Sequence, residues 1–259
     1  MIKEFCTLAK IDKDIEKILL SYPKDEELKL KMREAVKAKD RESVVELATQ
    51  SQSLYGSLYP LVLFSYSLDI TKTFFPSEKI LIDTLSDFPI WLSNFKRDYG
   101  YTGMANLPWL SRHITGTLMR LGRLQAEVTV SELIGKEKIL SLHIPQGESL
   151  SPEKVDASLA LIKKQFPEFD KAYCFSWLLD PALEQVLERG SNIISFQKRF
   201  SIFPIPSDNG KQTFERVFFT GATIDDVINF TPVTKLQMNI QQAVKDGISF
   251  SQFGGLINL

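Results

Sequence analysis

The chain has 259 residues, of which 44% are hydrophobic and 24% charged, so it can bury one large core or two ordinary ones. Its formal net charge of −1 gives no electrostatic argument for a nucleic-acid or anionic-membrane partner. The longest apolar run, Leu58 to Tyr66, contains Pro60 and is shorter than the roughly 20 residues that span a bilayer. The N-terminus becomes charged before a signal-peptide core can form, so we expect a cytoplasmic protein.

Cysteine and histidine are too sparse for most metal or nucleophile chemistry. The two cysteines, Cys6 and Cys174, lie far apart in the sequence and are expected to be reduced. His113 and His143 are the two histidines, and neither belongs to an HExxH or CxxC pattern, so we predict no metal site. A Ser-His-Asp hydrolase is also disfavoured, because the sequence has no GxSxG motif.

The first 121 residues carry apolar side chains at helical spacing. Asp40 and Ser77 are placed to cap helices. We expect helices over residues 12–22, 25–38, 40–48, 54–69, 77–87 and 109–121, the last ending at Gly122. Pro60 is expected to kink or break the helix over 54–69.

The hydrophobic period changes from 3.6 to 2 near Leu121. Strands are expected over 122–128, 139–144, 171–179, 193–202 and 214–219, the last two joined by a hairpin at SDNGK. Helices are expected to begin at Ser151, Asp180, Thr223 and Thr234, with the Gly254-Gly255 pair in a terminal loop. The change of period predicts two domains, residues 1–121 and 122–259.

The segment from Ile139 to Pro152 is the best functional lead from the residues themselves. A predicted strand there runs through a polar loop containing Gly147 into a helix that Ser151 and Pro152 open. The start of a helix has backbone N–H groups without partners, which attract an anionic ligand.

Several segments carry a resemblance to a known family: GRLQ from Gly122, LHIPQG from Leu142, SPEKVD from Ser151, SWLLDP from Ser176 and SNIISFQKRF from Ser191. They resemble the GNAT-like C-terminal domain of bacterial acyltransferase domain-containing proteins, which follows a helical N-acyltransferase N-terminal domain. The resemblance implies an α+β fold, with a helical N-terminal domain and a GNAT-like mixed sheet flanked by helices.

The resemblance also implies an acyl-coenzyme A co-substrate. Its pantetheine arm would lie between the strands 139–144 and 171–179, and its pyrophosphate on the loop before the next helix. That placement makes Gln146, Gly147, Ser149 and Ser151 cofactor-binding candidates. The loop, PQGESLS, departs from the usual multi-glycine pattern of the family and contains Glu148.

His143 is the candidate general base, because an imidazole titrates near neutral pH and can accept a proton from an amine. The alternative is a core histidine bonded to a backbone carbonyl. Glu127 is a second catalytic candidate. It shares the polar face of a strand with Arg123 and Gln125, which we predict to bind substrate. That face is equally compatible with solvent exposure or with internal pairing of Arg123 and Glu127.

Two small polar residues complete the predicted substrate site, Ser141 on the strand that carries His143 and Ser176 on the aromatic strand. Cys174, next to Ser176, is expected to be inert and buried. The sequence thus predicts an acyl-CoA-dependent N-acyltransferase in which an unidentified amine attacks the thioester directly. The alternative is a non-catalytic protein that keeps the fold and binds a ligand or partner, which the atypical loop favours.

Overall fold

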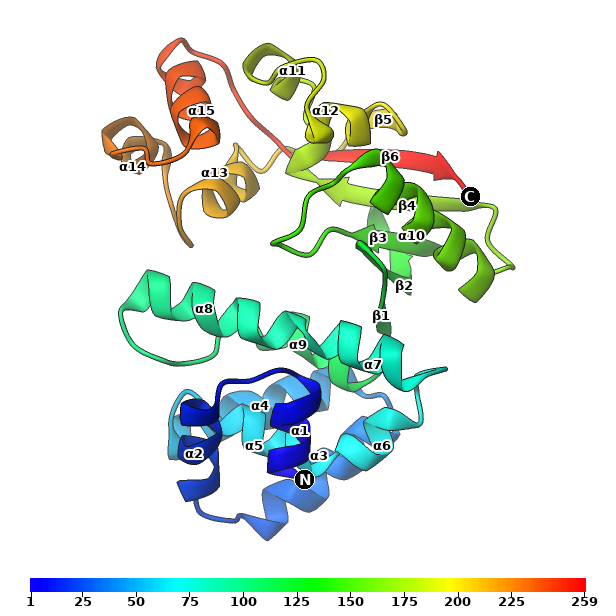
Figure 1. The fold of residues 1–259 in the computed structure, drawn as a ribbon, viewed down its shortest axis with the longest axis vertical. Coiled ribbons are helices and arrows are strands. Elements are labelled where there is room, and N and C mark those ends of the chain that lie inside the picture. Colours follow the sequence, from blue (N-terminus) through cyan, green and yellow to red (C-terminus); the bar gives the residue numbers. More distant parts are fainter. The chain divides into compact units, whose positions relative to one another are not determined.

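The computed structural model describes residues 1–259, and the chain forms two compact units (Figure 1). The first unit contains Met1–Leu121, Gln125–Glu127 and Pro145–Gly147. The second contains Gly122–Leu124, Val128–Ile144 and Glu148–Leu259.

The first unit is a bundle of helices around a continuous apolar core. Helix α5 is buried along its whole length, as its uninterrupted apolar run requires. Asp40 and Ser77 cap α4 and α7 by accepting from the N–H groups of Ser43 and Ile80, so both expected caps are confirmed. The helices are α1 Ile2–Leu8, α2 Lys13–Ser21, α3 Glu26–Lys37, α4 Arg41–Tyr55, α5 Tyr59–Tyr66, α6 Leu68–Lys72, α7 Glu78–Leu85, α8 Asp87–Tyr99 and α9 Leu107–Ile114.

The break expected at Pro60 is confirmed: segment 54–69 is divided, and Pro60, which lacks an N–H, lies in the first turn of α5. Two other helices differ in extent from the prediction, and the one expected over 40–48 continues to Tyr55 as α4. Helix α9 ends at Ile114 rather than continuing to residue 121, and Leu118–Leu121 forms strand β1. The β-branched Thr115 and Thr117 disfavour further helix, and the N–H of Arg120 in β1 donates to Thr84 Oγ1 at 2.8 Å.

The remaining strands are β2 Leu124–Ser131, β3 Glu137–His143, β4 Lys171–Ser176, β5 Ser201–Pro204 and β6 Phe253–Asn258. They form one six-stranded sheet in the order β1-β2-β3-β4-β6-β5. β3 and β4 run parallel, and β6 is antiparallel to both β4 and β5. The sheet is therefore mixed, and the expected α+β class is confirmed.

Helices of the second unit alternate with the strands along the chain, and residues of α11 to α15 form a separate apolar cluster. Figure 1 shows α13, α14 and α15 grouped together, apart from α10. The helices are α10 Pro152–Gln165, α11 Leu183–Val186, α12 Asn192–Gln197, α13 Lys211–Val217, α14 Ile224–Asn229 and α15 Lys235–Lys245. The helices expected from Ser151, Thr223 and Thr234 are confirmed as α10, α14 and α15.

Three expected elements of the second unit were wrong. Residues 193–197 of the strand expected over 193–202 are helical, because Ser191 caps α12 by accepting from the N–H of Ile194, and of that segment only 201–202 lie in a strand, β5. Residues 214–219 belong largely to α13, since the Asp208 carboxylate binds the N–H groups of Gly210 and Gln212 and opens a helix instead of a hairpin. The Gly254-Gly255 segment is a strand, β6, and not a loop.

Strand β6 contains glycine for steric reasons. A Cβ on Gly254 would lie 2.3 Å from Cε2 of Phe203, and one on Gly255 would lie 2.7 Å from Cδ1 of Leu179. These distances are far below normal van der Waals contact, so the neighbouring side chains exclude any larger residue. The low strand propensity of glycine hid this strand in the sequence.

Candidate functional site

The parallel strands β3 and β4 stop pairing before either strand ends. Their register pairs Ser141 with Tyr173 and Leu142 with Cys174, and His143 follows directly. Residues that are paired across two strands point to the same face of the sheet, and so do alternate residues along one strand. His143 therefore lies on the same face as Ser141 and Tyr173. His143 is half-buried, and Ser141 is buried. The structure therefore places both predicted site residues at the point where two central strands separate.

The loop after His143 is anchored at both of its ends. Gln146 Oε1 accepts from Asn94 Nδ2 of α8 at 2.9 Å, within the first unit. In the second unit, the Ser149 carbonyl accepts from Arg123 Nε at 3.2 Å, and Ser149 Oγ accepts from Asn192 Nδ2 at 2.6 Å. The substrate-binding candidate Arg123 thus contacts the predicted cofactor loop.

Two features of this loop bear on anion binding. Ser151 occupies the N-cap position of α10 but makes no side-chain hydrogen bond to the helix, so it leaves the N–H groups of the first turn without a side-chain cap. Glu148 forms an ion pair with Lys154 of α10, with 2.8 Å between its carboxylate and Nζ. The negative charge of Glu148 is therefore offset by a cation on the same helix start.

Gly147 lies in a conformation that other residues rarely adopt. Its φ is +117°, while the space around its absent Cβ is open. The backbone angle, and not steric crowding, therefore requires glycine here.

Small residues of β4 lie on the opposite, buried face. Cys174 is fully buried, and burial raises the pKa of its thiol to about 12, so it remains a neutral thiol at physiological pH. Ser176 accepts from the N–H of Leu178 at 3.1 Å and so caps the short turn that follows β4. The structure gives Ser176 a local capping contact and separates it from the face that carries His143.

The polar face of β2 is buried. Arg123, Gln125 and Glu127 expose 5%, 0% and 2% of their surface, which excludes the solvent-facing alternative. Glu127 forms an ion pair with Arg112 of α9, within the first unit. Gln125 is unusual, because neither Oε1 nor Nε2 of its side chain has a hydrogen-bond partner.

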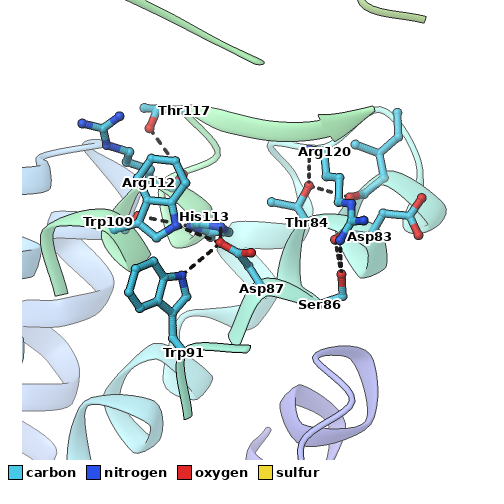
Figure 2. A network of polar contacts seen from close by, with 11 residues as sticks. Asp83, Thr84, Ser86, Asp87, Trp91, Trp109, Arg112, His113, Thr117 and Arg120 are labelled. Carbon is cyan, nitrogen blue, oxygen red and sulfur yellow. Dashed lines mark hydrogen bonds and ion pairs between the residues drawn. The ribbon is translucent and has the colours of Figure 1, made fainter. Parts of the chain in front are cut away.

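A second polar network lies in the first unit, and our sequence analysis did not identify it. Figure 2 shows the buried Asp87 carboxylate at its centre. Asp87 Oδ2 accepts from Trp109 Nε1 at 2.8 Å and from Trp91 Nε1 at 3.3 Å, and lies 3.1 Å from His113 Nε2. The residues come from α8 and α9, and no short motif links them. Spacing of His113 and Trp109 at i,i+4 on one predicted helix was the single available signal.

The protonation of this network follows from its contacts. Burial alone would raise the pKa of Asp87, but the hydrogen bond and charge of His113, with the two indole N–H groups, outweigh burial and lower that pKa to about 2. The other ring nitrogen of His113 lies 3.2 Å from the carbonyl oxygen of Trp109. The guanidinium of Arg112 lies over the Trp109 ring, 5.2 Å from its centroid.

A cavity of about 430 Å³ lies in the second unit, away from the residues described above. Its walls come from the start of α13 and the segment that leads into α14, and include Lys211, Phe214 and Thr223. None of the predicted site residues lines it. No helix is long and apolar enough to cross a membrane, and no His, Cys, Asp and Glu cluster is arranged to hold a metal ion.

A helical bundle followed by a mixed sheet, whose central parallel strands separate before a loop and helix, defines a GNAT-like acyltransferase fold. Residues 118–257 match the GNAT-like C-terminal domain family, and residues 2–116 match the N-acyltransferase N-terminal domain family. The chain therefore belongs to the family of acyltransferase domain proteins that carry a GNAT-like C-terminal domain.

Solved structures share this fold at low sequence identity. An acyltransferase in complex with decanoyl-CoA and teicoplanin has a TM-score of 0.80 and 21% identity, and the match covers 99% of this chain and 87% of the other. An acyltransferase in complex with CoA and 10C-teicoplanin has a TM-score of 0.80 and 20% identity, and the match covers 99% of this chain and 87% of the other. A further acyltransferase in complex with decanoyl-CoA has a TM-score of 0.70 and 19% identity, and the match covers 100% of this chain and 99% of the other. None of the curated proteins matches the chain by sequence.

Proposed function

We propose that this protein is an acyl-CoA-dependent N-acyltransferase that acts on a small-molecule amine. The observation that carries the proposal is the early end of the β3–β4 ladder at Leu142 and Cys174, followed directly by His143. The amide groups of a pantetheine arm would bind beside the ends of these two strands, where a thioester would lie close to His143. The structural relatives, which are acyltransferases in complex with acyl-CoA or CoA, support the same assignment.

The loop and helix after His143 supply a site for the charged end of the acyl donor. The pyrophosphate would bind N–H groups between Gln146 and Glu153, at the start of α10, where the helix dipole favours negative charge. The positive charge of Lys154 offsets the negative charge of Glu148, so the partial positive charge at the N-terminus of α10 can attract the pyrophosphate. Gln146, Gly147, Ser149 and Ser151 are the proposed contacts.

The reaction follows from these positions. The amine nitrogen attacks the thioester carbonyl carbon, the C–S bond breaks, and CoA leaves as a thiolate. His143 accepts the proton that the nitrogen loses and returns it to the thiolate, so atoms and charge balance. Strand N–H groups polarise the carbonyl oxygen as negative charge develops on it. Arg123, Gln125 and Ser141 remain the proposed substrate contacts, and Glu127 a second proton acceptor. Ser176, which caps a turn on the opposite face of β4, is no longer proposed to contact substrate.

A non-catalytic ligand-binding protein is the second candidate. The observation that favours it is the loop, which has a single glycine and places Glu148 beside the helix start. Both candidates fit a cytoplasmic location, where unpaired thiols such as Cys6 and Cys174 stay reduced.

Two measurements separate the candidates. Acyl-CoA binding to the folded state must raise the melting temperature, so a panel of thioesters from acetyl-CoA to decanoyl-CoA tests binding. Incubation with primary amines then tests turnover through release of free CoA thiol. The protein's own thiols add little background, because burial raises the pKa of Cys6 to about 11 and that of Cys174 to about 12. Binding without thiol release favours the second candidate, and absence of binding contradicts the first.

A further inference from the structure

The charge of a single carboxylate, that of Glu127, acts on two arginines of the first unit, but it pairs with only one of them. Arg41, at the start of α4, and Arg112, on α9, lie on helices that contact each other. Arg112 pairs with Glu127, whereas Arg41 makes no hydrogen bond or ion pair with any residue. The Nε atoms of both guanidinium groups are buried and without partners.

The charges of this cluster do not cancel. The pKa of Arg41 is lowered by burial and, secondarily, by the positive charge of Arg112, while Glu127 raises it. Arg41, Arg112 and Glu127 together carry an excess of one positive charge, and their site is partly buried, since the Arg112 side chain is 26% exposed and that of Glu127 3%. Other arginines of the chain show the usual arrangement: Arg33 pairs with Asp69, and Arg199 with Asp156. Arg41, in contrast, has no carboxylate paired with it.

Gln125 provides an independent observation at the same place. It lies two residues before Glu127 on β2, so both side chains point to one face of the strand. Gln125 is fully buried, yet its amide oxygen and nitrogen both lack partners. A buried amide with neither group satisfied is costly, and such sites are usually completed by water or a ligand.

The three side chains together specify the chemistry of the missing partner. Water can satisfy Gln125 but cannot neutralise the excess charge of Arg41. A phosphate dianion would overcompensate that charge and be repelled by Glu127. A carboxylate carries one negative charge and two acceptor oxygens, which match guanidinium N–H groups and an amide N–H. We propose that Arg41, Arg112 and Gln125 form a binding site for the carboxylate group of a small molecule.

This site does not depend on acyl transfer, so it is tested by binding alone. The Nε–H signals of Arg41 and Arg112 are followed by NMR of ¹⁵N-labelled protein during titration with acetate, propionate, acetamide and inorganic phosphate. Saturable shifts are expected with acetate and propionate, and none with acetamide. Equal shifts with acetamide, tighter binding of phosphate, or no saturable shift with any probe would overturn the proposal.

Variants assign the effect to these residues. Arg41→Gln is expected to weaken acetate binding by roughly 10-fold or more, and Gln125→Leu by a smaller factor. Arg33→Gln is the matched control, because it removes a guanidinium that already has an acidic partner, and it should leave binding unchanged. If Arg41→Gln fails to fold, Arg41→Lys keeps the charge but loses the planar fork and should weaken binding several-fold. Undiminished acetate binding in either Arg41 variant contradicts the assignment.

The carboxylate has two possible sources in an acyltransferase, the acyl chain of the donor or the amine acceptor. Comparing succinyl-CoA with butyryl-CoA by calorimetry distinguishes them. A preference for succinyl-CoA that Arg41→Gln abolishes assigns the donor, and the absence of such a preference assigns the acceptor. If neither thioester binds, the proposed function fails while the acetate titration still decides this site.

Discussion

Leu142 of β3 and Cys174 of β4 form the last registered pair of the parallel ladder, and His143 is the next residue along β3. Past this pair, β4 continues to Ser176 in its antiparallel ladder with β6. The end of β3 thus places a titratable side chain beside the central strand β4, and an acyl-transfer site needs such a group close to the reacting atoms.

Replacing His143 tests its role as general base. His143→Gln should lower turnover by roughly 10²-fold or more, because glutamine cannot accept a proton, with little change in acyl-CoA affinity. Steady-state CoA release and a thermal-shift titration measure the two quantities. Lys138→Gln, an exposed change on the same strand, is the control and should retain full activity. Equal turnover in both variants would show that the base lies elsewhere.

The loop before α10 is tested at Gly147. Proline fixes φ near −65°, whereas Gly147 has a φ of +117°, so Gly147→Pro should distort the loop and weaken CoA binding by about 10-fold. Arg216→Ala, on α13, should bind CoA normally. Calorimetry gives both affinities, and circular dichroism verifies folding. Unchanged affinity in a folded Gly147→Pro protein would place the pyrophosphate at another site.

The Arg112–Glu127 pair should show strong coupling. Glu127→Gln removes the single carboxylate between Arg112 and Arg41, and we expect it to lower the free energy of unfolding by about 2–3 kcal/mol. This range is below that of a fully buried pair, because the Arg112 side chain is 26% exposed. The double variant Arg112→Gln with Glu127→Gln should recover part of the loss. Urea unfolding of the two single variants and the double variant measures the coupling, and additive losses would argue against it.

Asp87 should make the stability depend on acid pH. Its pKa is lowered from 3.8 to about 2 in the folded protein, so its contribution is complete above pH 3.8 and is lost as the pH falls toward 2. The contribution at neutral pH is about 2 kcal/mol. Asp87→Asn should therefore flatten the stability profile between pH 4 and 2, measured by urea unfolding at several pH values. Asp225→Asn, at an exposed site on α14, is the control and should leave the pH dependence of the free energy of unfolding unchanged.

The sequence predicted the elements whose signals are local. Strand β3, helix α10 and strand β4 lie close to the expected bounds, because alternation, a Ser-Pro start and an aromatic strand are readable within a few residues. Strand β6 was missed, since its glycines are explained by the rings of Phe203 and Phe200, about fifty residues earlier in the chain.

The candidate site shows the same division between local and distant signals. The position of His143 at a strand end followed from the local pattern. The partner of Glu127 did not, because Arg112 lies on a helix that no motif connects to β2. The Asp87 network was missed for a similar reason, as its members come from two helices and converge only in the folded protein.

Strand β6 also sets the order in which the sheet can form. β4 and β5 both precede β6 in the sequence, yet each is bonded to β6, which follows after α13, α14 and α15. During synthesis, both strands therefore carry unsatisfied edges until residues 253–258 leave the ribosome, and exposed strand edges promote aggregation. A chaperone that shields apolar edges would act in that interval, and any shortened chain that stops before Phe253 should be prone to form inclusion bodies.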